Sequence, residues 1–270
     1  MSPRRAPASR SRGLPPTGVA WLGVLAMALV ILPLVGLLVS TPWRRLGDLL
    51  SDQTVLAALR LSLLTSLAAL TASTVLGVPL AWLLARRDFP AKTFLRALCV
   101  LPMVLPPVVG GVALLLAFGR RGLIGQPLDQ LTGITLPFTT SGVVLAETFV
   151  AMPFLVVTVE AGLRSMDRRY EDVAATLGAS RWLSFRRVTL PLLGPSLGAG
   201  MALCWARALG EFGATITFAG NLSGRTQTMP LAVYLQLERD VDAAILLSLV
   251  LLAVSVVVLV ALRGRYLDSG

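Results

Sequence analysis

Apolar residues occur along the chain in six runs, each long enough to cross a bilayer as a helix. A hydrocarbon core of roughly 30 Å needs about 20 apolar residues in an α-helix. We therefore predict an all-α polytopic membrane protein with six transmembrane helices. The predicted spans are Val19–Val39, Leu61–Ala85, Ala97–Phe118, Gly142–Leu163, Leu192–Ala219 and Ala243–Leu262.

The polar segments between and beyond these runs divide the chain. Residues 1–18, rich in Pro, Arg and Ser, are predicted to be a disordered basic tail. Residues 19–54 hold the first span and an outer loop. This span is too long for a signal peptide, whose apolar region is about 7–15 residues. Residues 55–262 form the core, with a polar hairpin at 165–191 and short outer loops at 119–141 and 220–242. Residues 263–270 form a second tail.

The distribution of basic residues predicts the orientation of the spans. With the N-terminus in the cytoplasm, sixteen of the 24 Lys and Arg residues lie inside and seven lie outside. Cytoplasmic loops of membrane proteins carry this excess. The prediction is therefore that both termini and the 165–191 hairpin are cytoplasmic, in a multi-pass membrane protein.

Composition supports a membrane protein and excludes several classes of function. Hydrophobic residues make up 55% of the chain and charged residues 14%, against about 25% charged in soluble domains. The net charge of +10 is explained by the cytoplasmic loops, so no nucleic-acid partner is expected. There is no His, and Cys99 and Cys204 lie in apolar runs without metal or redox spacing. A membrane enzyme would need such a cluster or an acidic pair.

The polar stretch from Glu171 to Pro191 reads as two short helices joined at a glycine. Glu171 and Asp172 complement the positive end of a first helix, whose apolar face includes Ala174 and Leu177. Gly178 is suited to the left-handed geometry that ends a helix. Ser180 is a good N-cap for a second helix, which carries Trp182 and Phe185 on one face, and Pro191 begins the next span. Exposed aromatic residues ringed by Arg favour a docking surface; packing on the bundle or on lipid is the alternative.

The spacing of this stretch resembles the coupling loop of ABC-importer permeases. The family pattern is Glu-Ala-Ala, three residues, Gly, nine residues, Ile, one residue and Leu-Pro. Asp172, Val173 and Ala174 stand in the first positions, Gly178 follows at the right spacing, and the stretch ends at Val188, Leu190 and Pro191. Asp replaces Glu, Val replaces Ala and Val replaces Ile, and Glu171 supplies a carboxylate one residue early.

The resemblance implies that the hairpin docks into a groove on a separate cytoplasmic ATPase and couples its motion to the spans. The residues it implies for coupling are Glu171, Asp172, Ala174, Leu177, Gly178, Trp182, Phe185 and Pro191. No cofactor is then expected on this chain, since ATP and Mg would bind to two ATPase subunits. The only Lys, Lys92, lies outside any G-x-x-x-x-G-K-[ST] phosphate loop.

Two charges lie inside the predicted fifth span. Arg207 and Glu211 are four residues apart and can pair along one helix face. Intramembrane charges are expensive, so a functional role in the path is the other interpretation. Glu147, at a similar depth in the fourth span, is a further possible partner for Arg207.

Prolines and glycines interrupt the third and fifth spans. The third span contains Pro102, Pro106, Pro107 and Gly110. Proline removes backbone hydrogen bonds, which indicates either a gate lining or a simple kink. Gly213 lies among glycines that allow membrane helices to approach closely.

The stretches "LPMVLPPVVGG", "GRRGLIG", "TLGASRW", "ALGEFGATITFAGN" and "TQTMPLAVY" extend the resemblance over residues 55–262 to the molybdate permease branch. The sulfate/thiosulfate permeases are similar, and a tungstate permease is a further alternative. The resemblance implies a type I importer fold, a second copy of the chain lining one path in the lipid bilayer, and an extracytoplasmic molybdate-binding protein. The rival class is an ATP-independent secondary transporter, which predicts ionisable relays or an inverted repeat.

Overall fold

The computed structural model describes residues 17–266, and every regular element in that range is a helix. The all-α prediction is therefore confirmed for the described part of the chain. The chain divides into two compact units, Met1–Thr41 and Pro42–Gly270, which are described separately. The predicted tails, residues 1–18 and 263–270, lie largely outside the described residues.

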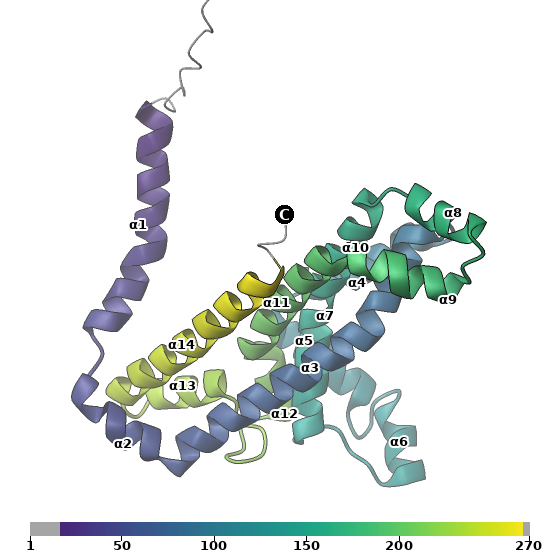
Figure 1. Ribbon diagram of the computed structural model, residues 1–270. Coiled ribbons are helices and arrows are strands. Elements are labelled where there is room, and N and C mark those ends of the chain that lie inside the picture. Colours follow the sequence, from purple (N-terminus) through teal and green to yellow (C-terminus); the bar gives the residue numbers. More distant parts are fainter. Residues whose placement is uncertain (1–16, 267–270) are drawn as a thin grey trace, which may run out of the picture. The chain divides into compact units, whose positions relative to one another are not determined.

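The described part of the first unit, residues 17–41, contains one helix, α1 (Thr17–Val39), drawn in purple in Figure 1. Its apolar stretch Gly18–Val39 has a mean hydropathy of 2.8 and is long enough to cross a membrane. Pro33 lies inside the helix, and such a proline is tolerated in membrane helices more readily than in soluble ones. The helix agrees with the predicted first span.

The second unit begins with a short 3₁₀ turn, η1 (Trp43–Arg45), and continues through helices separated by short connections. The remaining elements are α2 (Leu46–Ser51), α3 (Gln53–Arg86), α4 (Lys92–Val104), α5 (Pro107–Phe118), α6 (Gly125–Thr132), α7 (Thr140–Ser165), α8 (Arg169–Thr176), α9 (Arg181–Ser184), the π-helical turn η2 (Phe185–Thr189), α10 (Leu190–Leu192), α11 (Gly194–Leu209), α12 (Gly213–Ala219), α13 (Met229–Leu237) and α14 (Val241–Tyr266).

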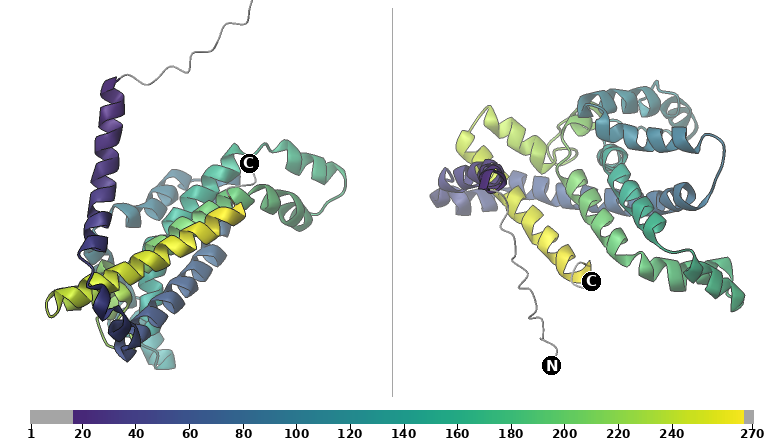
Figure 2. Two further views of the ribbon diagram at one scale, coloured as in Figure 1. Left: turned by 60° about the vertical axis from the view of Figure 1, so that its left-hand side comes forward. Right: turned by 90° about the horizontal axis from the view of Figure 1, so that it is seen from above.

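The core of the second unit is built around α7, which packs against both α3 and α11 (Figures 1 and 2). Leu155, Val159 and Leu163 of α7 are buried together with Leu84 of α3 and Leu193 at the start of α11. Van der Waals packing between these side chains holds the helices together, because lipid tails are as apolar as leucine and valine. These three helices position the polar hairpin at one end of the unit.

The number of spans depends on how two bent helix pairs are counted. Four described helices are long and apolar enough to cross a membrane, and six segments result if each bent pair forms one span. The predicted third span, Ala97–Phe118, is interrupted between α4 and α5, whose axes differ by 120°. The second bent pair joins Arg181–Leu192 to Gly194–Leu209 at 71°. The predicted fifth span, Leu192–Ala219, therefore bends near its start, and it is divided again into α11 and α12 around residues 210–212. The count of six stays a prediction.

The segment 220–242 differs from the short outer loop that we expected. It contains α13, and Thr226, Thr228, Met229 and Leu231 are buried. The helix is too short to cross a bilayer, but its apolar residues pack in a cluster with α3 and α14. The Ser62 hydroxyl on α3 accepts a hydrogen bond from the Met229 amide at 2.6 Å, so one unpaired N–H at the start of α13 has a partner.

We predict that Ser62→Ala destabilises the protein by about 1–3 kcal/mol, because the buried Met229 amide is left without a partner. Ser66→Ala is the matched control, since Ser66 is equally buried but bonds only to the Leu63 carbonyl of its own helix. Its loss is expected to be no more than about 1 kcal/mol. Thermal unfolding in detergent measures both, and equal losses would contradict the role assigned to Ser62.

Candidate functional site

The first helix of the hairpin, α8, forms where the sequence predicts a helix, but it begins two residues before the expected start at Glu171. Asp167 Oδ1 accepts a hydrogen bond from the Arg169 amide at 2.9 Å, and α8 starts at Arg169 instead of Glu171. Glu171 and Asp172 lie in the first turn, where negative charge is favoured by the helix dipole.

The turn between the two helices is a Schellman motif. The Ala179 amide donates to the Ala174 carbonyl and the Gly178 amide donates to the Ala175 carbonyl, both at 3.0 Å. Gly178 has φ +81°, a conformation that carries a steric penalty for residues with a Cβ. The predicted role of Gly178 in ending the helix is confirmed.

The second helix is short and begins at its predicted cap. Ser180 Oγ accepts a hydrogen bond from the Leu183 amide at 3.2 Å. The rings of Trp182 and Phe185 stack with centroids 5.8 Å apart, so they share one face as expected. Pro191 lies in the first turn of α10, a position that tolerates proline.

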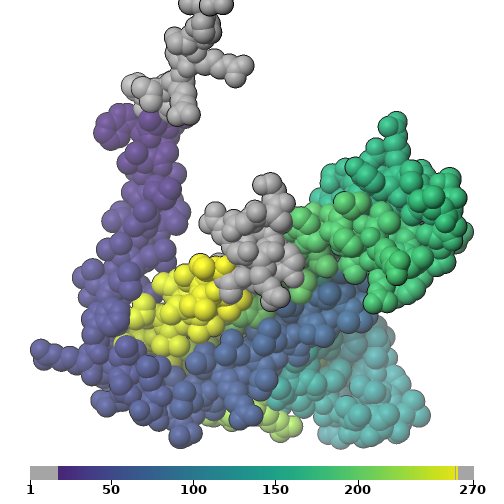
Figure 3. All heavy atoms as spheres, viewed as in Figure 1, coloured from purple at the N-terminus to yellow at the C-terminus, as the bar shows by residue number. Residues whose placement is uncertain are grey.

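Apolar side chains of the hairpin form an exposed surface, which we call the hairpin face. Leu177 is 82% exposed and Trp182 is 69% exposed, and Tyr170 and Val173 of α8 are exposed as well. The hairpin stands out from the helices of the second unit in the space-filling view, at the right-hand end (Figure 3). An exposed apolar surface of this kind is available for a partner protein or for the lipid interface. Ala174 and Phe185 are half-buried.

The two adjacent carboxylates of the hairpin have different surroundings. Glu171 Oε1 accepts a hydrogen bond from Thr189 Oγ1 at 2.9 Å and lies 3.3 Å from Arg86 Nη2 at the end of α3. Asp172 is exposed. Glu171 therefore holds the hairpin to the bundle, while Asp172, which stands at the acidic position of the coupling-loop pattern, remains accessible.

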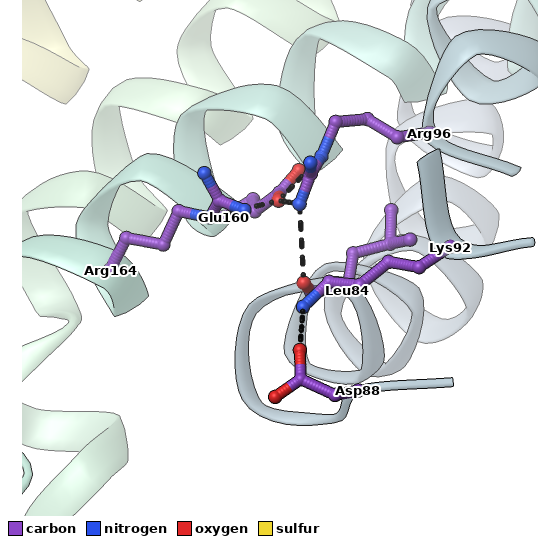
Figure 4. A network of polar contacts seen from close by, with 6 residues as sticks. All are labelled: Leu84, Asp88, Lys92, Arg96, Glu160 and Arg164. Atoms are coloured by element: carbon purple, nitrogen blue, oxygen red, sulfur yellow. Dashed lines mark hydrogen bonds and ion pairs between the residues drawn. The ribbon is translucent and has the colours of Figure 1, made fainter. Parts of the chain in front are cut away.

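A second ion-pair network ties α4 to α7 and α3 (Figure 4). Arg96 of α4 donates to Glu160 of α7 through Nε at 2.9 Å and Nη2 at 2.5 Å, and Nη2 also lies 3.4 Å from the Leu84 carbonyl. Arg164 pairs with the same carboxylate at 3.2 Å. The network fixes the first half of α4, about two turns of helix before its break with α5.

The loop between α3 and α4 carries a further pair. Lys92 Nζ donates to Asp88 Oδ1 at 2.9 Å. This hydrogen bond, together with the charges of Lys92 and Arg168, holds the pKa of the Asp88 carboxyl below its usual range. The pair is exposed, so it contributes little to stability.

The proline–glycine positions of the third and fifth predicted spans are in direct contact. A Cβ on Gly213 would lie 2.6 Å from Cβ of Pro107, and a Cβ on Gly111 would lie 2.6 Å from Cβ of Thr217. Gly110 is buried against Phe149. The start of α5 and the start of α12 therefore approach as closely as glycine allows.

The remaining prolines lie at the break itself. Pro106 is the N-cap of α5, with Pro107 at the first helical position, and Pro102 lies inside α4 on the other side of the break. A 120° change of direction is more than the simple kink we considered. The structure brings Pro107 into contact with Gly213 and places Gly110 against Phe149 of α7, whereas Pro102 belongs to the helix before the turn.

The intramembrane charges pair locally. Arg207 Nη2 lies 2.5 Å from Glu211 Oε2, and Glu211 Oε1 accepts a hydrogen bond from the Ala214 amide at 2.8 Å. Glu211 thus caps α12 as well as neutralising Arg207. Our alternative partner for Arg207 was wrong: Glu147 accepts a hydrogen bond from Thr65 Oγ1 at 2.9 Å instead.

Sequence analysis missed Arg96, Glu160 and Thr65. Glu160 carries a usable signal, since it is an acidic residue inside a predicted span with Arg164 four positions later. Its partner Arg96 is 64 residues away, and no local pattern identifies that pair. Thr65 is one of several hydroxyl residues on α3 and is distinguished only by its contact with Glu147.

Comparison with known proteins gives consistent matches. The family model described as "Binding-protein-dependent transport system inner membrane component" matches residues 77–270. The molybdenum transport system permease protein of Mycobacterium tuberculosis is 47% identical over 93% of this chain and 96% of its own. The sulfate transport system permease protein of Salmonella typhimurium is 38% identical over 87% of this chain and 86% of its own.

The fold is shared with solved structures. A bacterial ABC transporter involved in the import of the acidic polysaccharide alginate matches with a TM-score of 0.76 and 15% identity, over 94% of this chain and 95% of that chain. The same transporter class in complex with an alginate pentasaccharide-bound periplasmic protein matches with a TM-score of 0.75 and 16% identity. At this identity the likeness concerns the fold.

The Arg96–Glu160 pair generates a stability prediction. Arg96→Gln leaves the buried Glu160 carboxylate with Arg164 as its remaining ion-pair partner, and we expect a loss of about 1.5–3 kcal/mol. Arg164→Gln removes the more exposed partner of the same carboxylate and is expected to lose no more than about 1 kcal/mol. Thermal unfolding of the two variants measures the difference.

The double variant Arg96→Gln/Glu160→Gln is the control for that prediction. It removes both charges, so it should be more stable than Arg96→Gln alone. Equal stability of Arg96→Gln and Arg164→Gln would contradict the assignment of α4 anchoring to Arg96.

Proposed function

The chain belongs to the family of binding-protein-dependent transport system inner membrane components, and we propose that it is the transmembrane subunit of an ATP-driven molybdate importer. The observation that carries this choice is the 47% sequence identity with a molybdenum permease over 93% of the chain. Sulfate/thiosulfate or tungstate import is the second candidate. It is favoured by the 38% identity with a sulfate permease.

In the proposed importer, two copies of the chain line one path across the bacterial inner membrane. The close contact of α5 with α12, where Gly213 meets Pro107, supports a path element that involves both helices. We propose that the two helix starts move apart and together at this contact during transport. The other residues proposed for the path lie on the segments that lead into or form this contact between α5 and α12. They are Pro102, Pro106, Gly110, Arg207 and Glu211.

The path offers little positive charge to a dianion. Arg207 is paired with Glu211, so its charge is largely neutralised. A tight oxyanion site would need several donors or helix N-termini. We therefore propose a weak, transient passage, with selectivity supplied by an extracytoplasmic molybdate-binding protein that delivers the ion.

The hairpin face is the proposed docking surface for the ATPase. Its exposed Leu177 and Trp182 supply apolar contact, Asp172 supplies an accessible charge, and Ala174, Gly178, Phe185 and Pro191 shape the hairpin. Two cytoplasmic ABC ATPase subunits would bind ATP and Mg, and this chain would act as a transport subunit without an ATP site of its own. Glu171, tied to Arg86 and Thr189, would pass motion of the hairpin to α3.

The proposed orientation places both termini and the hairpin in the cytoplasm, with six spans. The excess of basic residues in these segments supports it. The rival class, an ATP-independent secondary transporter, has less support. The pairing of Arg207 with Glu211 leaves a self-contained ion pair instead of a relay, and the family consists of binding-protein-dependent systems.

The hairpin face gives the first functional prediction. Leu177→Asp should lower association with the candidate ATPase about tenfold or more, because a charge replaces an apolar side chain that docking would bury, and each 1.4 kcal/mol is tenfold. Leu131→Asp is the matched control, since Leu131 on α6 is 84% exposed but lies outside the hairpin. Co-purification and ATPase activity in proteoliposomes measure the effect.

The same assay tests the substrate. Binding protein loaded with molybdate should stimulate ATP hydrolysis, while sulfate-loaded and empty binding protein should not. Equal stimulation by sulfate would favour the second candidate. Association with the ATPase that is unaffected by Leu177→Asp would contradict the coupling role of the hairpin.

Orientation is tested by thiol labelling in a Cys99→Ala/Cys204→Ala background. Thr176→Cys on α8 and Ser223→Cys in the turn before α13 introduce single exposed thiols. A membrane-impermeant maleimide added to intact spheroplasts should label Ser223→Cys and should reach Thr176→Cys only after lysis. The reverse pattern would overturn the proposed orientation.

A further inference from the structure

A cavity lies between the hairpin and the end of α3. Its volume is about 420 Å³, and its lining comes from the C-terminal end of α3, the first turn of α8, and α9 with η2. Four arginines belong to the lining. The residues used in the argument are Trp82, Arg86, Arg87, Arg168, Arg181 and Thr189.

Arg86 at the base of this cavity has an unused donor. Its side chain is only 7% exposed, and its Nη2 lies 3.3 Å from Glu171 Oε1. Its Nε is buried and has no hydrogen-bond partner among the described residues. A buried donor of a charged group without a partner is costly, and Nε meets an acceptor in the cavity once the Arg86 guanidinium turns toward it.

Positive charge exceeds negative charge around the cavity. The lining contains four arginines but only the carboxylates of Glu171 and Asp172. Glu171 Oε1 is already shared by Arg86 and Thr189. Arg87, Arg168 and Arg181 are exposed at the rim, where like charges brought together by three different segments repel one another.

We propose that this cavity binds a tetrahedral oxyanion group of the phosphate class. Arginine suits such a group because its planar donors bind two oxygens at once. The group is either a free inorganic oxyanion or the phosphate of an anionic lipid headgroup. Trp82 beside the arginines fits the lipid source, since tryptophan is common where membrane proteins meet the interface.

The bound group would connect α3 to the hairpin. Arg86 and Arg87 come from the end of α3, whereas Arg168 and Arg181 flank α8 and begin α9. An anion held by both sets replaces their repulsion by attraction and should reduce local opening of the hairpin. Binding itself is independent of the proposed function. Only its effect on coupling to an ATPase rests on that function.

The test uses the full chain, without ATPase, in nanodiscs of neutral phosphatidylcholine. Equilibrium dialysis with radiolabelled phosphate, sulfate and molybdate measures binding of free anions. Native mass spectrometry after addition of phosphatidylglycerol measures binding of the headgroup source. Amide exchange of residues 168–189 with and without ligand reports on the hairpin.

The variants separate the deep donor from general charge. Arg86→Gln should weaken binding about tenfold or more, the equivalent of 1.4 kcal/mol. Arg168→Gln/Arg181→Gln, which changes only exposed rim residues, should also weaken binding and avoids any folding defect of Arg86→Gln. Arg121→Gln, an exposed arginine between α5 and α6, is the control and should bind as the unmodified chain does. Binding should also weaken as ionic strength rises.

The outcomes decide both the site and its source. Saturable binding of a free anion that is lost in the cavity variants supports the site and a soluble ligand. Retention of phosphatidylglycerol that is lost in the same variants supports the site and a lipid ligand. Absence of both, or binding that is equal in Arg168→Gln/Arg181→Gln and Arg121→Gln, overturns the proposal.

Discussion

The arrangement of the second unit depends on finding partners for backbone groups wherever a helix is interrupted inside an apolar bundle. Unpaired amides are expensive in a membrane, and the interruptions at the starts of α12 and α13 both meet this demand with a polar side chain. Glu211 accepts from the Ala214 amide, and Ser62 accepts from the Met229 amide. Because these acceptors are fixed in the core, the short helices can end and restart without exposing their amides to lipid.

Charge pairs extend this order from the core to the hairpin. Arg96 and Glu160 join α4 to α7 beside the Leu84 carbonyl of α3, and Arg86 near the end of the same helix pairs with Glu171 of the hairpin. The C-terminal end of α3 is therefore shared by both networks. In the proposed importer, this end is the physical link between the surface that meets the ATPase and the broken helix α4–α5.

The hairpin was predictable because its signals are local. A positive-φ glycine, a serine cap and an acidic first turn act within a few residues, and Gly178 and Ser180 have the roles that their positions predicted. The different surroundings of Glu171 and Asp172 were not predictable, because they depend on Arg86, which lies 85 residues away in the chain. The cavity beneath the hairpin depends on the same long-range approach.

Sequence alone determined the membrane class, the apolar segments, the hairpin and the possibility of an Arg207–Glu211 pair, since each follows from composition or from spacing within a few turns of helix. Tertiary structure decided that Glu147 pairs with Thr65, that α4 and α5 diverge by 120°, and that α13 packs into the core. Hydropathy records how apolar a segment is but not its direction. Direction and partner are set by contacts between segments far apart in the chain, where packing selects one arrangement among several that the local pattern allows.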